Sequence, residues 1–162
     1  MKNKLENFLG GRLLTMEVKD FLLKNQKMME CPLYRGLPYP KHLLYVGQTI
    51  EEWYGSSHWS KDKEVAIDFS NDYINEDYEE ELLEERDEVE FISLVLVLDK
   101  VQGIDMEPFI LHYGLFEDFG HEKEVTVLNK DFEIVDIKEE IISGEYIYFA
   151  KVIAKNRNVE GR

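Results

Sequence analysis

The apolar run over residues 90–98, Glu-Phe-Ile-Ser-Leu-Val-Leu-Val-Leu, constrains the fold more than any other segment. Nine residues are too few to cross a membrane as a helix, and the branched and aromatic side chains favour a strand. Because hydrophobic residues follow one another almost without polar alternation, both faces of this strand are expected to be buried. The run therefore predicts a central strand in a covered sheet.

Helical patterns are concentrated in the first half of the chain. Apolar residues three to four apart predict an amphipathic helix over 12–29, separated by Gly10-Gly11 from a short N-terminal helix. A second helix is expected over 61–69, with Ser60 or Asp62 as its N-cap.

Strand patterns dominate the second half. Besides 90–98, apolar and branched residues predict strands over 32–36, 43–50, 122–128, 132–137 and 145–154, with an irregular stretch around Pro38 and Pro40. Helices followed by strands are typical of an α+β fold, and not of an alternating α/β fold.

Length and charge limit the organisation and the partners. The 162 residues fit one domain over 1–162, with a helical part over 1–30 and the main core over 31–154. The net charge of −15 argues against nucleic acid as the partner, because phosphates need basic residues to meet them. Ten acids and one arginine fall in 76–90, so 71–88 is expected to be a solvated surface helix or loop.

The single cysteine, Cys31, excludes an internal disulfide and indicates a reducing compartment. We expect Cys31 to be a buried small hydrophobe and not a catalytic thiol. The sequence shows neither a run of 18 apolar residues nor a signal peptide, which predicts a cytoplasmic protein without membrane contact.

Two carboxylates stand at the start of a predicted strand, in Glu122-Lys123-Glu124. Side chains two apart in a strand project from the same face, and two like charges there are unfavourable. The pair is therefore either a solvated strand start or a functional pair.

Three motifs occur in order along the chain: Tyr34-Arg35-Gly36, then Ser57-His58-Trp59-Ser60, then Glu122-Lys123-Glu124. This order resembles the arginine–serine–glutamate class of mono-ADP-ribosyltransferases, which has an arginine strand, a serine-rich strand with a following helix, and a Glu-x-Glu strand start. Residues 59–69, 121–125 and 131–135 also look like segments of that family. The resemblance covers roughly residues 30–154.

The resemblance implies an α+β domain in which N-terminal helices pack on two small β-sheets with an NAD cleft between them. It implies NAD as the substrate, transfer of ADP-ribose to a protein acceptor, release of nicotinamide and no metal. The four histidines do not have metal-ligand spacing. The small chain further resembles a bacterial or phage-encoded effector that acts on a host protein in a bacterial cytoplasm.

The family pattern implies a role for five of these residues. Arg35 would bind the NAD diphosphate bidentately beside Tyr34, and Gly36 would allow a ligand close to the backbone. Glu124 would stabilise the oxocarbenium-like transition state and hold the ribose 2′-hydroxyl. Glu122 would act on the acceptor, and glutamate at this position implies an arginine acceptor.

The serine motif departs from the family, which commonly has Ser/Thr-x-Ser/Thr. Aligning Trp59-Ser60 with the family pattern puts His58 at the residue that orients the catalytic glutamate, whereas a shifted register puts Ser57 there. A neutral histidine can donate one hydrogen bond to a carboxylate, so His58 is chemically able to substitute.

Aromatic residues are further candidates. Trp59 and Phe69 either pack in the core or face the NAD. Tyr113, Phe116 and Phe119 precede the glutamates in a segment that contacts the acceptor in the family; they are either exposed recognition residues or a cover for the core.

Three other functions remain open at this point. The first is an NAD glycohydrolase with water as the acceptor in the same cleft. The second is a catalytically silent module whose acidic segment 76–90 binds a basic site on a host protein. The third is an enzyme of the same class with an RNA 5′-NAD acceptor, and the charge of −15 makes docking of RNA electrostatically costly.

Overall fold

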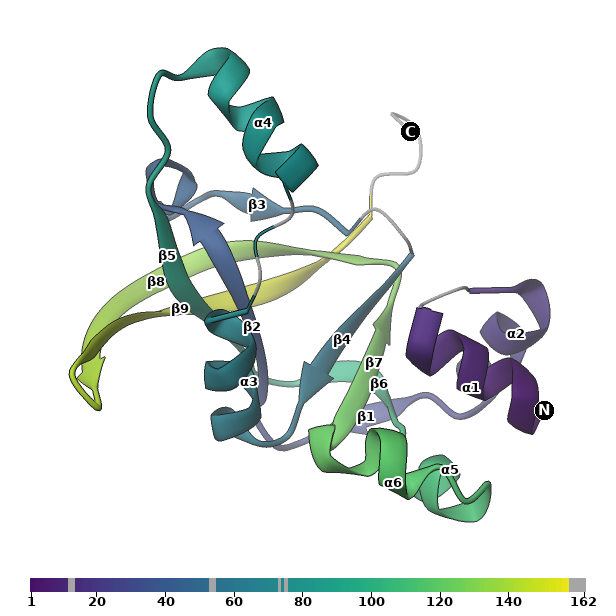
Figure 1. Cartoon of the computed structure of the whole chain (residues 1–162). Helices are drawn as coiled ribbons and strands as arrows, with labels where there is room; N and C mark the ends of the chain where they lie inside the picture. The colour runs from purple at the N-terminus through teal and green to yellow at the C-terminus, as the bar shows by residue number, and fades with distance from the viewer. Residues whose placement is uncertain (12–13, 53–54, 73, 75, 158–162) are drawn as a thin grey trace.

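The computed structural model describes residues 1–11, 14–52, 55–72, 74 and 76–157. Two short helices, α1 (Lys2–Gly11) and α2 (Met16–Lys24), begin the chain. The other helices are α3 (Lys63–Ser70), α4 (Glu76–Glu85), α5 (Glu107–His112) and α6 (Phe116–Phe119), with 3-10 turns η1 (Lys41–Leu43) and η2 (Gly120–Glu122). Figure 1 shows them around a long twisted sheet.

The described strands form one nine-stranded sheet in the order β1-β6-β7-β4-β2-β5-β9-β8-β3. Their bounds are β1 (Lys27–Met29), β2 (Leu33–Pro40), β3 (Thr49–Ile50), β4 (Ser56–Ser60), β5 (Phe91–Leu98), β6 (Val101–Asp105), β7 (Glu124–Leu128), β8 (Lys130–Ile142) and β9 (Glu145–Asn156). The expected arrangement of two small sheets is not confirmed. The two halves of the sheet join through β2 and β4, which pair only at Tyr34↔Ser60.

The predicted central strand is confirmed. β5 lies between β2, to which it is antiparallel, and β9, to which it is parallel. Leu94, Val95 and Leu96 on β5 are fully buried, as expected for a strand covered on both faces. Mostly antiparallel pairing with separate helices agrees with the α+β prediction.

The N-terminal helices form a second core with α5. Leu5 and Phe8 of α1 and Leu22 of α2 are fully buried, packed with Ile104, Met106 and Ile110. Figure 1 shows α1 and α2 beside β4, β7 and β6, on the opposite side of the molecule from the β8–β9 hairpin.

Several local predictions were wrong. The helix expected over 12–29 is α2 followed by β1, and residues 12–13 lie outside the described part. β2 continues through Pro38 and Pro40. Beyond Tyr34 it pairs only with β5 among the described strands, so its other edge needs no backbone N–H donors for a neighbouring strand. The strand expected over 43–50 is reduced to Thr49–Ile50. Cys31 is exposed and not buried.

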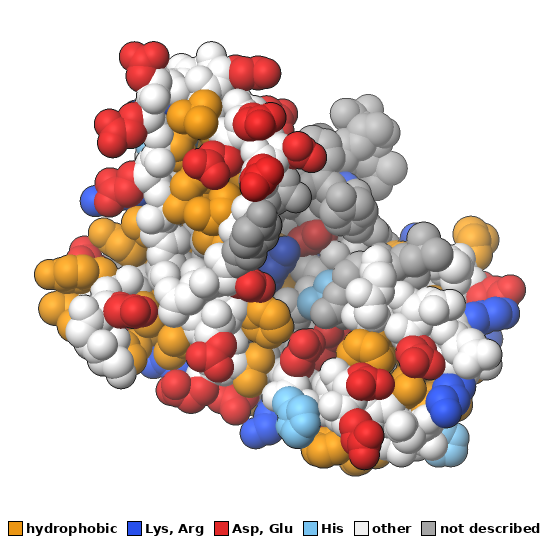
Figure 2. Space-filling model, in the orientation of Figure 1, with side chains coloured by type: hydrophobic (Ala, Val, Ile, Leu, Met, Phe, Trp, Pro, Cys, Tyr) orange, Lys and Arg blue, Asp and Glu red, His pale blue; other side chains and the backbone are white. Residues whose placement is uncertain are grey.

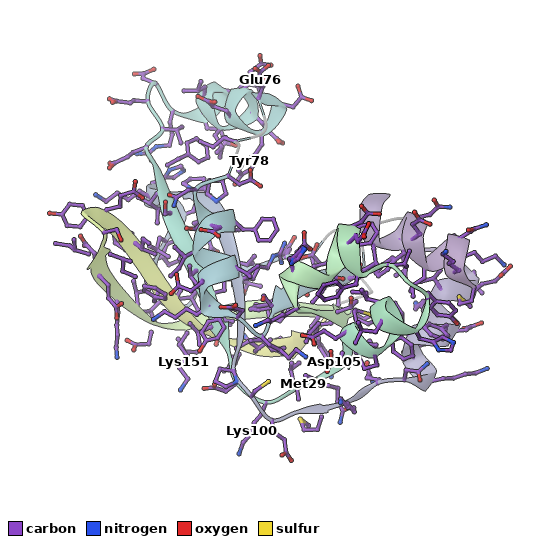
Figure 3. The ribbon with its side chains drawn as sticks, turned by 60° about the horizontal axis from the view of Figure 1, so that its bottom comes forward. Met29, Glu76, Tyr78, Lys100, Asp105 and Lys151 are labelled. Atoms are coloured by element: carbon purple, nitrogen blue, oxygen red, sulfur yellow. The ribbon has the colours of Figure 1, made fainter. Side chains whose placement is uncertain are left out.

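The acidic segment contains a helix that projects from the domain. α4 has no buried residue, and the edge of the Tyr78 ring packs on Phe91 with the ring centroids 6.5 Å apart. In Figure 3 Tyr78 lies on the sheet side of α4, whereas Glu76 points away from the sheet. This agrees with the surface-helix alternative for the described part of 71–88. Among the helices in the described ranges, none has the length and apolar content to cross a membrane.

Candidate active site

A cavity of about 160 Å³ lies where β2, β4, α3 and the start of β7 meet. Arg35, His58, Phe69, Glu122 and Glu124 line it. Figure 2 shows the corresponding hollow in the middle of this face, with basic and histidine side chains inside it and acidic side chains around its rim. The three sequence motifs, more than 80 residues apart at their extremes, therefore meet at one place.

Most of the predicted site residues line this cavity. Tyr34, Gly36, Trp59 and Ser60 join the five already named, and the remaining lining residues are Val65 and Ala66 of α3. Ser57, Tyr113, Phe116 and Phe119 are not among the lining residues.

A turn brings the two glutamates together, and not a shared strand face as expected. Glu122 ends η2, Lys123 has the left-handed backbone conformation with φ of 47°, and Glu124 begins β7. The Ser60 hydroxyl donates to the Glu122 carbonyl at 2.6 Å and accepts from the Asp62 N–H at 3.0 Å. Ser60 thus links this turn to the N-terminus of α3.

Glu124 is a buried carboxylate with several polar neighbours. The residue is 3% exposed. Its Oε2 atom lies 3.3 Å from His58 Nδ1 and accepts from the Thr126 hydroxyl, also at 3.3 Å. Burial without such partners would strongly destabilise a carboxylate, so these contacts help to hold Glu124 in the cavity wall.

His58 occupies the position predicted to orient Glu124. Its other ring nitrogen, Nε2, lies 3.4 Å from the Ser56 hydroxyl, and its ring lies 5.3 Å from the ring of Phe8 on α1. A neutral imidazole that donates through Nδ1 to Glu124 and accepts at Nε2 from Ser56 satisfies both contacts.

Strand alternation separates Ser57 from this site. Ser57 and Trp59 point to the opposite face of β4, where the Trp59 indole N–H donates to the Ser57 hydroxyl at 2.8 Å. Trp59 also packs edge-on against Phe132, with ring centroids 4.9 Å apart. The side chains of both residues therefore pack in the core, although Trp59 also borders the cavity. His58 and Ser60 lie on the face of β4 that contacts the glutamate segment.

Arg35 lies in the cavity wall with an acidic partner. Its NH1 atom donates to Glu52 Oε2 at 2.7 Å, and the side chains of Arg35 and Glu52 are 25% and 11% exposed. Arg35 thus contacts the Glu52 carboxylate and also lines the cavity.

Gly36 lies at the cavity, but its lack of a side chain has another structural reason. A Cβ atom there would stand 1.6 Å from the carbonyl oxygen of Ala66. Glycine therefore lets α3 lie directly on β2, and this close packing places Phe69 and Val65 at the cavity.

A second hollow, of about 350 Å³, adjoins the first. Val65, Phe69 and Glu122 line both, and Asp68, Asp72 and His121 line the second alone. Phe69, 40% exposed, and Glu122 therefore stand between the two hollows.

The three candidate acceptor aromatics have different environments. Tyr113 and Phe119 are partly buried against the core formed by α1, α2 and α5. Phe116 is 48% exposed and lies with its ring centroid 5.3 Å from that of His121. Of the three, Phe116 is the exposed one.

Sequence patterns missed several residues that support the site. Besides Glu52, these include Lys61, whose ammonium lies 3.0 Å from Asp105 Oδ2 and from Glu107 Oε1. Burial lowers the pKa of Lys61, but the hydrogen bonds to Asp105 and Glu107 outweigh it and raise the pKa above its ordinary value. The backbone N–H of Lys61 also donates to the Lys123 carbonyl at 3.2 Å. Through its backbone and its side chain, Lys61 therefore connects the glutamate turn to Glu107 at the start of α5.

Across the described residues, no group of three or more His, Cys, Asp and Glu side chains is arranged to hold a metal ion.

Comparison with known proteins identifies the fold. No family model and no curated protein matches the chain. Two solved structures of Vis toxin, an ADP-ribosyltransferase from Vibrio splendidus, match with TM-scores of 0.56 at 22% identity, and one of them is a complex with agmatine. A complex of Vis with the M6 inhibitor matches with a TM-score of 0.55 at 16% identity.

The extent of these matches is unequal on the two sides. The first two cover 86% of this chain but 54% and 55% of the Vis chains, and the third covers 96% and 67%. The chain thus spans about half the length of the first two structures. At this level of identity the similarity establishes an ADP-ribosyltransferase-like fold.

Proposed function

We propose that the protein transfers ADP-ribose from NAD to an acceptor and releases nicotinamide. The observation that carries the proposal is the meeting of Arg35, His58, Glu122 and Glu124 at one cavity. The resemblance of the sequence motifs and the fold shared with Vis support it independently.

Arg35 and Glu124 have different roles in the proposed reaction. Arg35 binds the NAD diphosphate through charge-assisted hydrogen bonds. The bond between the ribose C1′ and the nicotinamide nitrogen breaks, and nicotinamide leaves as a neutral molecule with the bonding electron pair. The Glu124 carboxylate stabilises the positive charge that develops on the ribose, and its burial makes this interaction stronger than it would be in water.

Glu122 serves the acceptor. The acceptor nitrogen forms a new bond to C1′, and its proton passes to the Glu122 carboxylate. We propose a protein arginine as the acceptor, supported by the position of Glu122 between two hollows and by the Vis complex with agmatine, a molecule that mimics arginine. We further propose that the acceptor belongs to a bacterial host protein and that the enzyme acts in a bacterial cytoplasm as a phage-encoded effector.

The test is incubation of the protein with adenine-labelled NAD and bacterial lysate, with nicotinamide release measured in parallel. We expect labelled protein bands, and we expect Glu122→Gln to lose the bands while nicotinamide release falls much less. Nicotinamide release without labelled protein would replace this proposal with an NAD glycohydrolase. The absence of both labelled protein and nicotinamide release would favour the binding module over an enzyme.

A further inference from the structure

The arginine assigned to the diphosphate, Arg35, contacts a buried carboxylate. Glu52 is 9% exposed, and its Oε2 atom accepts from Arg35 NH1 at 2.7 Å. A buried carboxylate is retained only when its partners compensate for lost hydration, so this contact is a built feature of the fold.

The position of Glu52 is fixed from the opposite side by β8. Glu52 follows β3, whose Ile50 pairs with Phe132 of β8. The Glu52 N–H donates to Asp131 Oδ1 at 3.0 Å, and Asp131 itself is 5% exposed. A chain of contacts thus runs from β8 through Asp131 and Glu52 to Arg35.

The contact with Glu52 leaves Arg35 able to bind a second anion. A guanidinium carries five N–H donors on three nitrogens in one plane, and the bond to Glu52 uses a donor on NH1. Arginine has a long side chain with considerable rotamer entropy, so fixing one nitrogen directs the remaining donors before any ligand arrives.

We propose that Glu52 is a positioning residue that orients Arg35 toward the diphosphate of NAD. This role rests on the proposed function of the cavity. Its basis is the reach of the Glu52 carboxyl and not its charge, because a negative charge near a diphosphate by itself opposes binding. An acceptor oxygen at the same place should therefore suffice.

Two matched variants separate reach from charge. Glu52→Asp keeps the charge and withdraws the carboxylate by one methylene, whereas Glu52→Gln keeps the reach and removes the charge. The assay is calorimetric binding of ADP-ribose, with KM and kcat for nicotinamide release and thermal unfolding measured on the same preparations.

We expect Glu52→Asp to weaken ADP-ribose binding and raise KM for NAD by about tenfold, with kcat changed less than about threefold. Glu52→Gln should bind ADP-ribose about as tightly as the wild type, or more tightly. A purely structural role would lower the unfolding temperature without this split between KM and kcat.

Normal ADP-ribose binding by Glu52→Asp would overturn the positioning role, and so would weak binding by Glu52→Gln alone. Failure of the wild type to bind ADP-ribose and to release nicotinamide would instead overturn the proposed function, and the role of Glu52 with it. The wild-type measurement therefore distinguishes the two failures.

Discussion

Replacing Gly36 by alanine tests the close packing on which the cavity depends. The added Cβ would stand 1.6 Å from the Ala66 carbonyl oxygen, 2.6 Å from the Ala66 carbonyl carbon and 2.7 Å from the Ser70 nitrogen. All three are backbone atoms, so no side-chain rotation relieves the clash. The helix α3 must move away from β2 by roughly 2 Å to restore ordinary contact distances.

The expected loss of stability is about 3 kcal/mol, at the upper end of the range for overpacking. This movement would open the packing of Ala66 and Ile67, which are 1% and 7% exposed. It would also displace Phe69 from the cavity wall, so nicotinamide release should fall together with stability. Urea unfolding followed by circular dichroism measures the free energy of unfolding.

Gly10→Ala is the matched control. Gly10 lies within α1, and its added Cβ would meet Phe119 at an ordinary distance of 3.8 Å. Alanine there should leave stability unchanged or raise it by up to about 1 kcal/mol, because alanine is the better helix former. A loss below about 1 kcal/mol for Gly36→Ala would refute the argument that α3 lies directly on β2.

Two further predictions concern Tyr39 and His58. Burial, followed by the charges of Tyr78 and Tyr45, raises the pKa of Tyr39 to about 12. Tyrosine is neutral when protonated, so above pH 10 the unfolded chain loses a proton that the folded chain keeps, and stability should fall between pH 10 and 12 by up to about 2 kcal/mol. Tyr39→Phe should flatten this part of the curve of unfolding free energy against pH; an unchanged slope would contradict the assignment. His58→Ala removes the ring nitrogen 3.3 Å from Glu124, and kcat for nicotinamide release should fall about ten- to a hundredfold while exposed His112→Ala has no effect. Equal rates for the two histidine variants would remove His58 from the site.

The sequence predicted the composition of the cavity better than its local geometry. Arg35, Glu122 and Glu124 were identified through motifs, and all three line the cavity. The turn between the glutamates was not predictable, because Lys123 at positive φ carries none of the glycine or asparagine signal that marks this conformation.

The supporting contacts were missed for a related reason. Glu52 meets Arg35 across 17 residues and Asp131 across 79, and such long-range pairs leave no periodic pattern in one sequence. Alternation within β4 did contain usable information. Given that Ser60 faces the glutamate turn, period two places His58 on the same face and Ser57 on the other.

Sheet topology was also beyond sequence reasoning. A single pair, Tyr34↔Ser60, connects the two halves of the sheet, and one residue pair has no signature in hydrophobic patterning. The prolines of β2 are tolerated because they lie where β2 pairs with β5 alone. This pairing depends on tertiary structure and not on local propensity.

The central claim is that Glu124 stabilises charge on the ribose of NAD. The direct measurement is the rate of nicotinamide release from NAD by the wild type, by Glu124→Gln and by Glu117→Gln, a control at an exposed carboxylate on α6. We predict that Glu124→Gln lowers kcat by about a hundred- to a thousandfold with folding intact, whereas Glu117→Gln retains the wild-type rate. Nicotinamide release by Glu124→Gln at the wild-type rate would contradict the account.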